Sequence, residues 1–128
     1  MNESSILHAA RRRDARLVCL AAMIALAVAM GVGRFAFTPL FPLMVRDGLL
    51  DAQSGALLAA SNYLGYLVGA LLAARLGLRP ATLLALGLLA TVTVTAAVGW
   101  ASSVAAWTLL RFVAGALSAW TLVATTAW

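Results

Sequence analysis

Two arginines lie inside stretches that are otherwise apolar enough to cross a lipid bilayer. Arg34 is in residues 17–45 and Arg111 is in residues 104–127, whereas the four acidic residues all lie outside such stretches. A charged side chain at the centre of a spanning helix costs at least about 2.5–3.5 kcal/mol on insertion scales, so it usually faces a bundle interior or a wet cavity. The sequence predicts that an anionic solute, water or an acid on another helix balances these charges. Extension of either side chain to the interface is the alternative.

Asn62 and Tyr66 lie four residues apart in a third apolar stretch, residues 54–74. In a helix they would share one face, where an amide and a phenol could orient a polar solute. An interhelical hydrogen bond with aromatic packing is the competing interpretation. With a rise of about 1.5 Å per residue, Arg34, Asn62 and Arg111 all reach the outer half of the membrane. We therefore expect Arg34, Asn62, Tyr66 and Arg111 to line a substrate cavity.

The sequence contains no recognisable catalytic constellation. His8 is the only histidine, and no serine has a histidine and an acid as partners. Paired carboxylates and a phosphate-binding glycine loop are also missing from the pattern. Cys19 is the single cysteine, so there is no metal-ligand spacing. The chain is therefore expected to be no enzyme and to use no metal and no cofactor.

The composition indicates a membrane protein. Of the 128 residues, 64% are hydrophobic and 10% are charged, against roughly 45–50% and about 25% in soluble domains. A spanning helix needs about 20 mostly apolar residues, and four stretches qualify. We predict an all-α integral membrane fold with transmembrane helices at about 17–45, 54–74, 81–99 and 104–127, after a polar tail at 1–16. Pro39 and Pro42 predict a kink or an early exit in the first span.

The net charge of +5 is distributed as a topology signal rather than as a nucleic-acid surface. Outside the predicted spans there are seven arginines. One of them, Arg46, lies between the first and second spans and so falls on one side of the membrane. The other six fall on the opposite side, as the positive-inside rule predicts for a cytoplasmic N-terminus. These six are Arg11, Arg12, Arg13, Arg16, Arg75 and Arg79. Binding of anionic lipid by the N-terminal cluster is a secondary possibility.

Small residues recur at four-residue intervals along the second predicted span. They are Ser61, Gly65, Gly69 and Ala73. This spacing aligns them on one helix face and lets a second helix approach closely. Together with Gly115 in the last span, they are predicted to mediate helix packing.

Several segments resemble the major facilitator superfamily of transporters. The turn at 70–80 resembles the signature between the second and third helices of that family: Arg75, Gly77 and Arg79 match, while Ala70 replaces a glycine and Ala74 an aspartate. Arg111 and Gly115 resemble the arginine and glycine of its fourth-helix motif, with Ala114 in place of a glutamine. The segments at 31–44 and 61–66 look like the YbfB/YjiJ-like branch.

The resemblance implies twelve spans in two halves of inverted three-helix repeats. This chain would then be the N-terminal third of a secondary transporter in the bacterial inner membrane. The implied mechanism is alternating access, often driven by a proton gradient, with the first and fourth helices lining the central cavity. The expected partners are a small solute, for which two unmatched cations favour an anion, the lipid bilayer and the remaining helices, but no nucleic acid.

Two other functions stay open at this point. The chain could be a short membrane protein that binds partner helices through its Gly65/Gly69 face. It could also be a complete four-helix transporter that assembles as a dimer.

Overall fold

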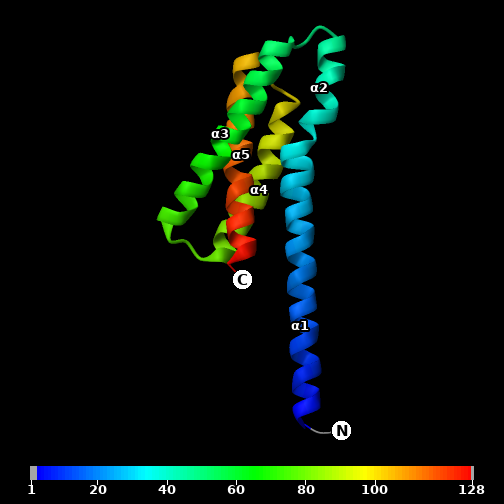
Figure 1. Cartoon of the computed structure of the whole chain (residues 1–128), viewed down its shortest axis with the longest axis vertical. Helices are drawn as coiled ribbons and strands as arrows, with labels where there is room; N and C mark the ends of the chain where they lie inside the picture. Colours follow the sequence, from blue (N-terminus) through cyan, green and yellow to red (C-terminus); the bar gives the residue numbers. More distant parts are fainter. Residues whose placement is uncertain (1–2, 128) are drawn as a thin grey trace.

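The described part of the chain folds into helices and connecting turns (Figure 1). The computed structural model describes the backbone of residues 3–127 and the side chains of residues 11–31 and 35–127. No strand occurs within that backbone range. The elements are α1 (Glu3–Leu26), the π-helix η1 (Ala27–Phe35), α2 (Phe37–Arg46), α3 (Ala52–Leu76), α4 (Pro80–Val98) and α5 (Val104–Thr126).

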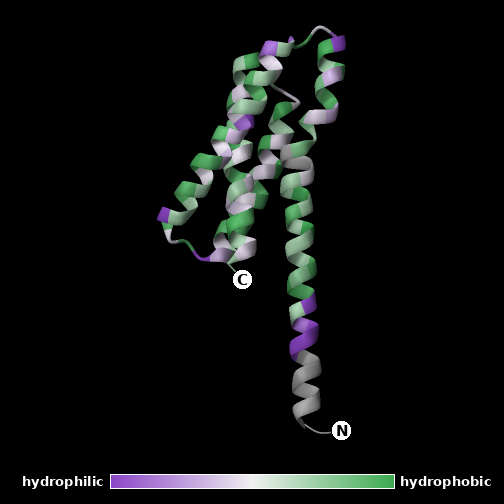
Figure 2. Cartoon of the chain, in the orientation of Figure 1, coloured by the Kyte–Doolittle hydropathy of each residue, from purple (hydrophilic) through white to green (hydrophobic). Residues whose placement is uncertain are grey.

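Among the described residues, four helical stretches are long and apolar enough to span a membrane: Arg11–Gly31, Ala52–Leu76, Pro80–Val98 and Val104–Thr126. In Figure 2 hydrophobic residues run along all four, and hydrophilic residues gather mainly near the helix ends. The predicted all-α, multi-pass membrane fold is therefore confirmed. The first helical run starts earlier than the predicted span at 17–45, because residues 3–16 continue the same helix as Leu17.

Helix α5 is the central element of the bundle. It packs against α3 on one side and α4 on the other, and it also contacts η1 and α1 (Figure 1). Its buried residues are small or of medium size: Ala114, Gly115, Leu117, Ser118, Ala119, Thr121 and Ala124. Small side chains allow close approach from several directions, which is how helices associate where lipid removes the hydrophobic driving force.

The contact between α3 and α5 depends on glycines that face backbone. A Cβ at Gly65 would overlap the Phe112 carbonyl, and one at Gly69 would overlap the backbone of Ala116. In the opposite direction, a Cβ at Gly115 would overlap the Asn62 carbonyl. The α3 face that carries Gly65 and Gly69 is thus the face that α5 covers.

Helix α4 touches α5 through a narrow stripe. Leu83, Gly87 and Thr91 are buried at four-residue intervals, and the Thr121 hydroxyl lies 2.6 Å from the position of a Cβ on Gly87. The Thr91 hydroxyl donates to the carbonyl of Gly87 at 2.6 Å, which satisfies it within its own helix. Large side chains such as Leu89 and Val92 point outward, as lipid-facing residues do.

The first membrane-spanning segment changes its geometry before it ends. Residues 27–35 form a π-helix, and the chain turns at Ala36 before α2 starts at Phe37. Pro39 has no N–H to donate to Phe35, four residues earlier, and its ring crowds that carbonyl. The helical run of α1 and η1 therefore ends at Phe35. The interruption predicted from Pro39 and Pro42 thus lies three residues ahead of the first proline.

The turns are closed by specific residues. Gly77 has φ +56° and ends α3, and Gly48 has φ +72° in the turn after α2. Both are left-handed conformations that glycine adopts without steric cost. The Asp51 side chain caps α3 by accepting the Ser54 amide at 2.7 Å, and Ser103 caps α5 through the Ala106 amide at 3.2 Å.

We predict that Gly65→Ala and Gly69→Ala each destabilise the bundle by about 1–3 kcal/mol, the usual range for overpacking. The added methyl meets backbone atoms, which cannot rotate away. Gly31→Ala is the matched control, since a Cβ there has open space around it, and alanine favours a helix by about 1 kcal/mol over glycine. Unfolding of the purified chain by SDS, followed by circular dichroism, measures the three variants. Equal stability of all three would contradict the packing.

A second prediction concerns the cap of α3 at low pH. Hydrogen bonds from the Ser54 side chain and then from its amide lower the pKa of Asp51 below its ordinary value of 3.8. A lowered carboxyl pKa stabilises the folded cap above 3.8, and this contribution is lost as the pH falls through the lower folded value. Protection of the Ser54 amide from hydrogen exchange should fall in that acid range. Asp51→Asn keeps an acceptor that does not titrate, so its protection should stay flat.

Candidate functional site

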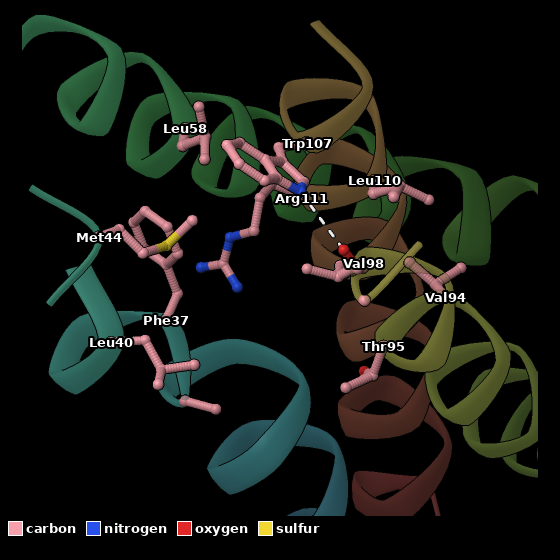
Figure 3. Close-up of a pocket in the computed structure, with 13 residues that line it drawn as sticks. Phe37, Leu40, Met44, Leu58, Val94, Thr95, Val98, Trp107, Leu110 and Arg111 are labelled. Carbon is pink, nitrogen blue, oxygen red and sulfur yellow. Dashed lines mark hydrogen bonds between the residues drawn. The ribbon is translucent and has the colours of Figure 1, made fainter. Parts of the chain in front are cut away.

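A cavity of about 170 Å³ lies between α2, α3, α4 and α5, with Arg111 in its wall. Figure 3 shows the guanidinium of Arg111 reaching from α5 into the space between α2 and α4. Its Nε atom is buried. The described residues that line the cavity are Ala36, Phe37, Leu40, Met44, Leu58, Val94, Thr95, Val98, Gly99, Trp107, Leu110, Arg111 and Ala114. Arg111 is the single charged residue among them.

The Arg111 guanidinium stacks on an aromatic ring. Its Cζ atom lies 4.7 Å from the centroid of the Phe37 ring, and Phe37 packs in turn against Phe41 with centroids 5.8 Å apart. A cation over an aromatic face gains about 0.5–1 kcal/mol when exposed and about 2 or more when desolvated. This contact joins the central helix α5 to α2 and holds the charge toward the cavity.

Trp107 forms another wall of the cavity. Its indole Nε1 donates to the carbonyl of Val98 at 3.3 Å, which closes the turn between α4 and α5 (Figure 3). A tryptophan near the end of a spanning helix is typical of the interfacial belt, so the sequence alone indicates no specific role for it. Its position four residues before Arg111, on the same face of a helix, is the signal that places the two together.

Asn62 and Arg111, which the depth estimate placed in the same half of the membrane, meet across the α3–α5 contact. The Asn62 side-chain amide donates to the backbone carbonyl of Arg111 at 2.8 Å, and Asn62 is 2% exposed. The interhelical hydrogen bond that competed with a cavity-lining role is therefore present. Tyr66 is half-buried beside Gly115. Neither Asn62 nor Tyr66 lines the Arg111 cavity, and their place along a transport pathway stays a prediction.

The other predicted residues fall into three places. Arg34 belongs to η1, and its side chain lies outside the described residues. Ser61 donates to the carbonyl of Leu58 in its own helix at 2.8 Å, while Ala73 is buried on the α3 face toward α5. The loop-signature residues Arg75, Gly77 and Arg79 are exposed around the turn between α3 and α4.

Sequence reasoning missed the polar contacts made by the second half of α5. The buried Ser118 hydroxyl lies 3.2 Å from the Ala29 carbonyl of η1 and 2.8 Å from the Ala114 carbonyl of its own helix. The Trp120 indole donates to the carbonyl of Gly69 at 3.1 Å. All three acceptors are backbone carbonyls, which no side-chain pattern reveals. These bonds fix α5 to η1 and α3 and so hold the helix that carries Arg111.

The described residues contain no group of three or more histidine, cysteine, aspartate or glutamate side chains that could hold a metal ion. Asp47, in the turn after α2, forms an exposed ion pair with Arg46 at 3.0 Å, and Asp51 caps a helix.

We predict that Asn62→Ala destabilises the bundle and disturbs the Arg111 cavity. Hydrogen bonds between membrane helices contribute about 0.6 kcal/mol on average and up to about 1.7 kcal/mol to stability. Because the bond from Asn62 is buried, we expect the variant to lose stability toward the upper value. Ser61→Ala is the matched control because its hydroxyl bonds only within α3 among the contacts described. Stability to SDS and Trp107 fluorescence measure the effect. Similar changes in both variants would contradict a specific role of the Asn62–Arg111 bond.

Comparison with known proteins matches this architecture to one family. The family described as the uncharacterised MFS-type transporter YbfB matches residues 26–128. No curated protein and no solved structure matches the chain. The matched residues run from the end of α1 through α5 and include the whole Arg111 cavity. The chain thus belongs to the YbfB family of MFS-type transporters, the branch that its first and second spans resemble.

Proposed function

We propose that this chain acts in a secondary active transporter that moves a small solute by alternating access. Membership in a transporter family and the four membrane-spanning helices support a multi-pass membrane protein with a small-molecule substrate. The observation that carries the finer proposal is Arg111, a cation inside a spanning helix that borders a cavity between four helices. A charge in such a position is a functional site by default, because insertion disfavours it.

An anionic solute is favoured over a cationic one. Asp47 and Asp51 lie in exposed turns at the end of the bundle, where one pairs with Arg46 and the other caps α3. The Arg111 guanidinium, by comparison, lies in the wall of the cavity, over the Phe37 ring. A negative charge on the solute would complement the guanidinium, whereas a positive charge would be repelled by it.

The predicted residues then take separate roles. Arg34 and Arg111 would contact the solute or a coupling acid, and Asn62 and Tyr66 would act along the pathway. The Asn62 bond to the Arg111 carbonyl supports a positioning role, since it fixes the turn of α5 that carries the guanidinium. Arg75, Gly77 and Arg79 would form the cytoplasmic loop between α3 and α4.

The remaining features of the proposal follow the family resemblance. The four helices would be the first four of twelve spans, in the bacterial inner membrane, with the N-terminus in the cytoplasm. Transport would involve no bond-making step, and a proton gradient would drive it. The alternative of a partner helix bound at the Gly65/Gly69 face is disfavoured, because α5 of the same chain already covers that face.

Transport measurements on arginine variants test this function. In the transporter with all helices that its gene encodes, Arg34→Met and Arg111→Met should insert normally and lose most transport, since each keeps an aliphatic stem and removes the charge. Arg34→Lys should recover little if a planar fork grips a carboxylate. Arg46→Met is the control, because Arg46 is exposed and pairs with Asp47. Near-normal transport by Arg34→Met at normal abundance would make Arg34 an interfacial anchor.

The orientation is tested by cysteine labelling. Gly48 and Gly77 have positive φ, so a cysteine at either position would strain its turn. Gln53→Cys and Leu78→Cys are exposed neighbours of these glycines, and Cys19→Ala removes the native thiol. In whole cells, an impermeant maleimide should label position 53 and leave position 78 unlabelled. The reverse pattern would place the N-terminus outside.

A further inference from the structure

We infer that the N-terminal part of α1 binds anionic phospholipids of the bilayer through Arg12, Arg13 and Arg16, which together form the arginine face of that helix. None of the three lines the Arg111 cavity, so this binding goes beyond the proposed transport function and is independent of it. Three observations carry it: the side of the helix on which the arginines lie, the distance to every acid of the chain, and the depth at which apolar residues begin.

The three arginines share one side of α1 and are exposed. The helix is regular over Glu3–Leu26, and a turn of about 100° per residue places Arg12, Arg13 and Arg16 within about 100° of arc. Ala25, which is 6% exposed, marks the side of α1 that packs against the bundle. It lies about 120–180° round the helix from the three arginines. The arginine face therefore points away from the bundle.

The acidic residues of this chain leave the arginine face unneutralised. Asp14 lies about 100–160° round the helix from the three arginines, on the side of Arg11 three residues before it. Glu3 is nine residues before Arg12, about 13 Å along the axis, which exceeds the screening length of about 10 Å at 0.1 M salt. The other two acids follow α2, at the opposite end of the bundle (Figure 1). Within the described side chains, no ion pair involves an arginine of this face.

The arginine face lies at the level of the lipid headgroups. About 20 residues cross the hydrocarbon, and the helical run from Leu17 to Phe35 supplies about that length without these arginines. Leu17, Leu20 and Ile24 continue the same side of the helix as apolar side chains that are more than half exposed. Figure 2 shows the hydrophilic segment of α1 further along the long axis than the ends of α3, α4 and α5 at this end of the bundle. Guanidinium groups at this depth meet phosphates, which they bind through two parallel N–H···O bonds.

Two considerations favour lipid as the partner. A nucleic acid would meet the same charges, but proteins that bind it tightly make about 6–10 phosphate contacts, and the arginine face offers three guanidinium groups. The positive-inside rule requires arginines at one end of a spanning helix, but it does not require them on one side of that helix. Lipid phosphates lie at the membrane surface beside that side, which makes anionic phospholipid the fitting partner.

Energy transfer from a fluorophore on Cys19 measures the lipids around the arginine face. Cys19 is the single cysteine, is exposed and follows Arg16 by three residues. The labelled chain is reconstituted in phosphatidylcholine vesicles that contain a small fraction of acceptor-labelled phosphatidylglycerol or acceptor-labelled phosphatidylcholine, each labelled on its acyl chain. One arginine near an anionic surface contributes about 1 kcal/mol, a factor of about five. Phosphatidylglycerol should thus be enriched about fivefold or more near Cys19, and 1 M salt should remove most of the preference. Equal transfer to both acceptors would overturn the inference.

A matched pair of double variants assigns the preference to the arginine face. Arg12→Gln with Arg16→Gln should lose most of the enrichment. Arg75→Gln with Arg79→Gln removes the same charge from exposed positions around the α3–α4 turn and should keep it. Arg12→Lys with Arg16→Lys should also keep most of it, since a phosphate attracts a compact charge as well. Circular dichroism checks the fold of each variant. An equal loss in the Arg75 and Arg79 variant would make net charge the cause and overturn the assignment to this face.

Two further measurements test the partner and the complete protein. A fluorescent oligonucleotide added to the vesicles should bind the wild type no better than the Arg12 and Arg16 glutamine variant. Preferential binding to the wild type, tighter than that of phosphatidylglycerol, would overturn lipid as the partner. In the transporter with all helices that its gene encodes and Cys19 as its sole cysteine, phosphatidylglycerol should again be enriched near that cysteine. Its absence there would show that another segment covers the arginine face and would overturn the inference, whether or not the protein transports a solute.

Discussion

The close contact of α3 with α5 is the constraint on which the remaining structure depends. Two glycines of α3 lie against the backbone of α5, and Gly115 of α5 lies against the backbone of α3. Only at this distance can the Asn62 amide reach the carbonyl of Arg111 and the Trp120 indole reach that of Gly69. In lipid, where apolar surface gives helices little reason to associate, such packing and hydrogen bonding hold a bundle together.

That contact also explains how the bundle accommodates an arginine. Asn62 fixes the backbone of the turn from which the side chain leaves, and Phe37 of α2 receives the guanidinium on its ring face. The charge is thus held between two helices that are distant in sequence from α5. The side chain faces a cavity rather than lipid, and the interaction energy of its neighbours offsets part of the insertion cost.

The sequence predicted the fold well and the site in part. Apolar length alone identifies four spans, and the four-residue spacing of Gly65, Gly69 and Ala73 marks the α3 face that α5 covers. Depth arithmetic predicted only that Asn62 and Arg111 lie in the same half of the membrane. The acceptors of Asn62, Trp107 and Trp120 are backbone carbonyls, which carry no side-chain signature. Phe37 could not be placed under Arg111 from the sequence either, because the helix before it changes its period.

That change of period has its own consequence. A π-helix bonds each residue to the fifth along the chain instead of the fourth, so each residue of η1 turns less about the axis and rises less along it than in an α-helix. Residues after Ala27 therefore lie a shorter distance along the axis from the start of α1 than a uniform α-helix would place them. The number of residues in η1 also sets which face of α2 points toward α5. Inserting or deleting one residue between Ala27 and Phe35 would rotate α2 about its axis and turn Phe37 away from Arg111. Length variation in this segment would thus reshape the cavity without altering any residue that lines it.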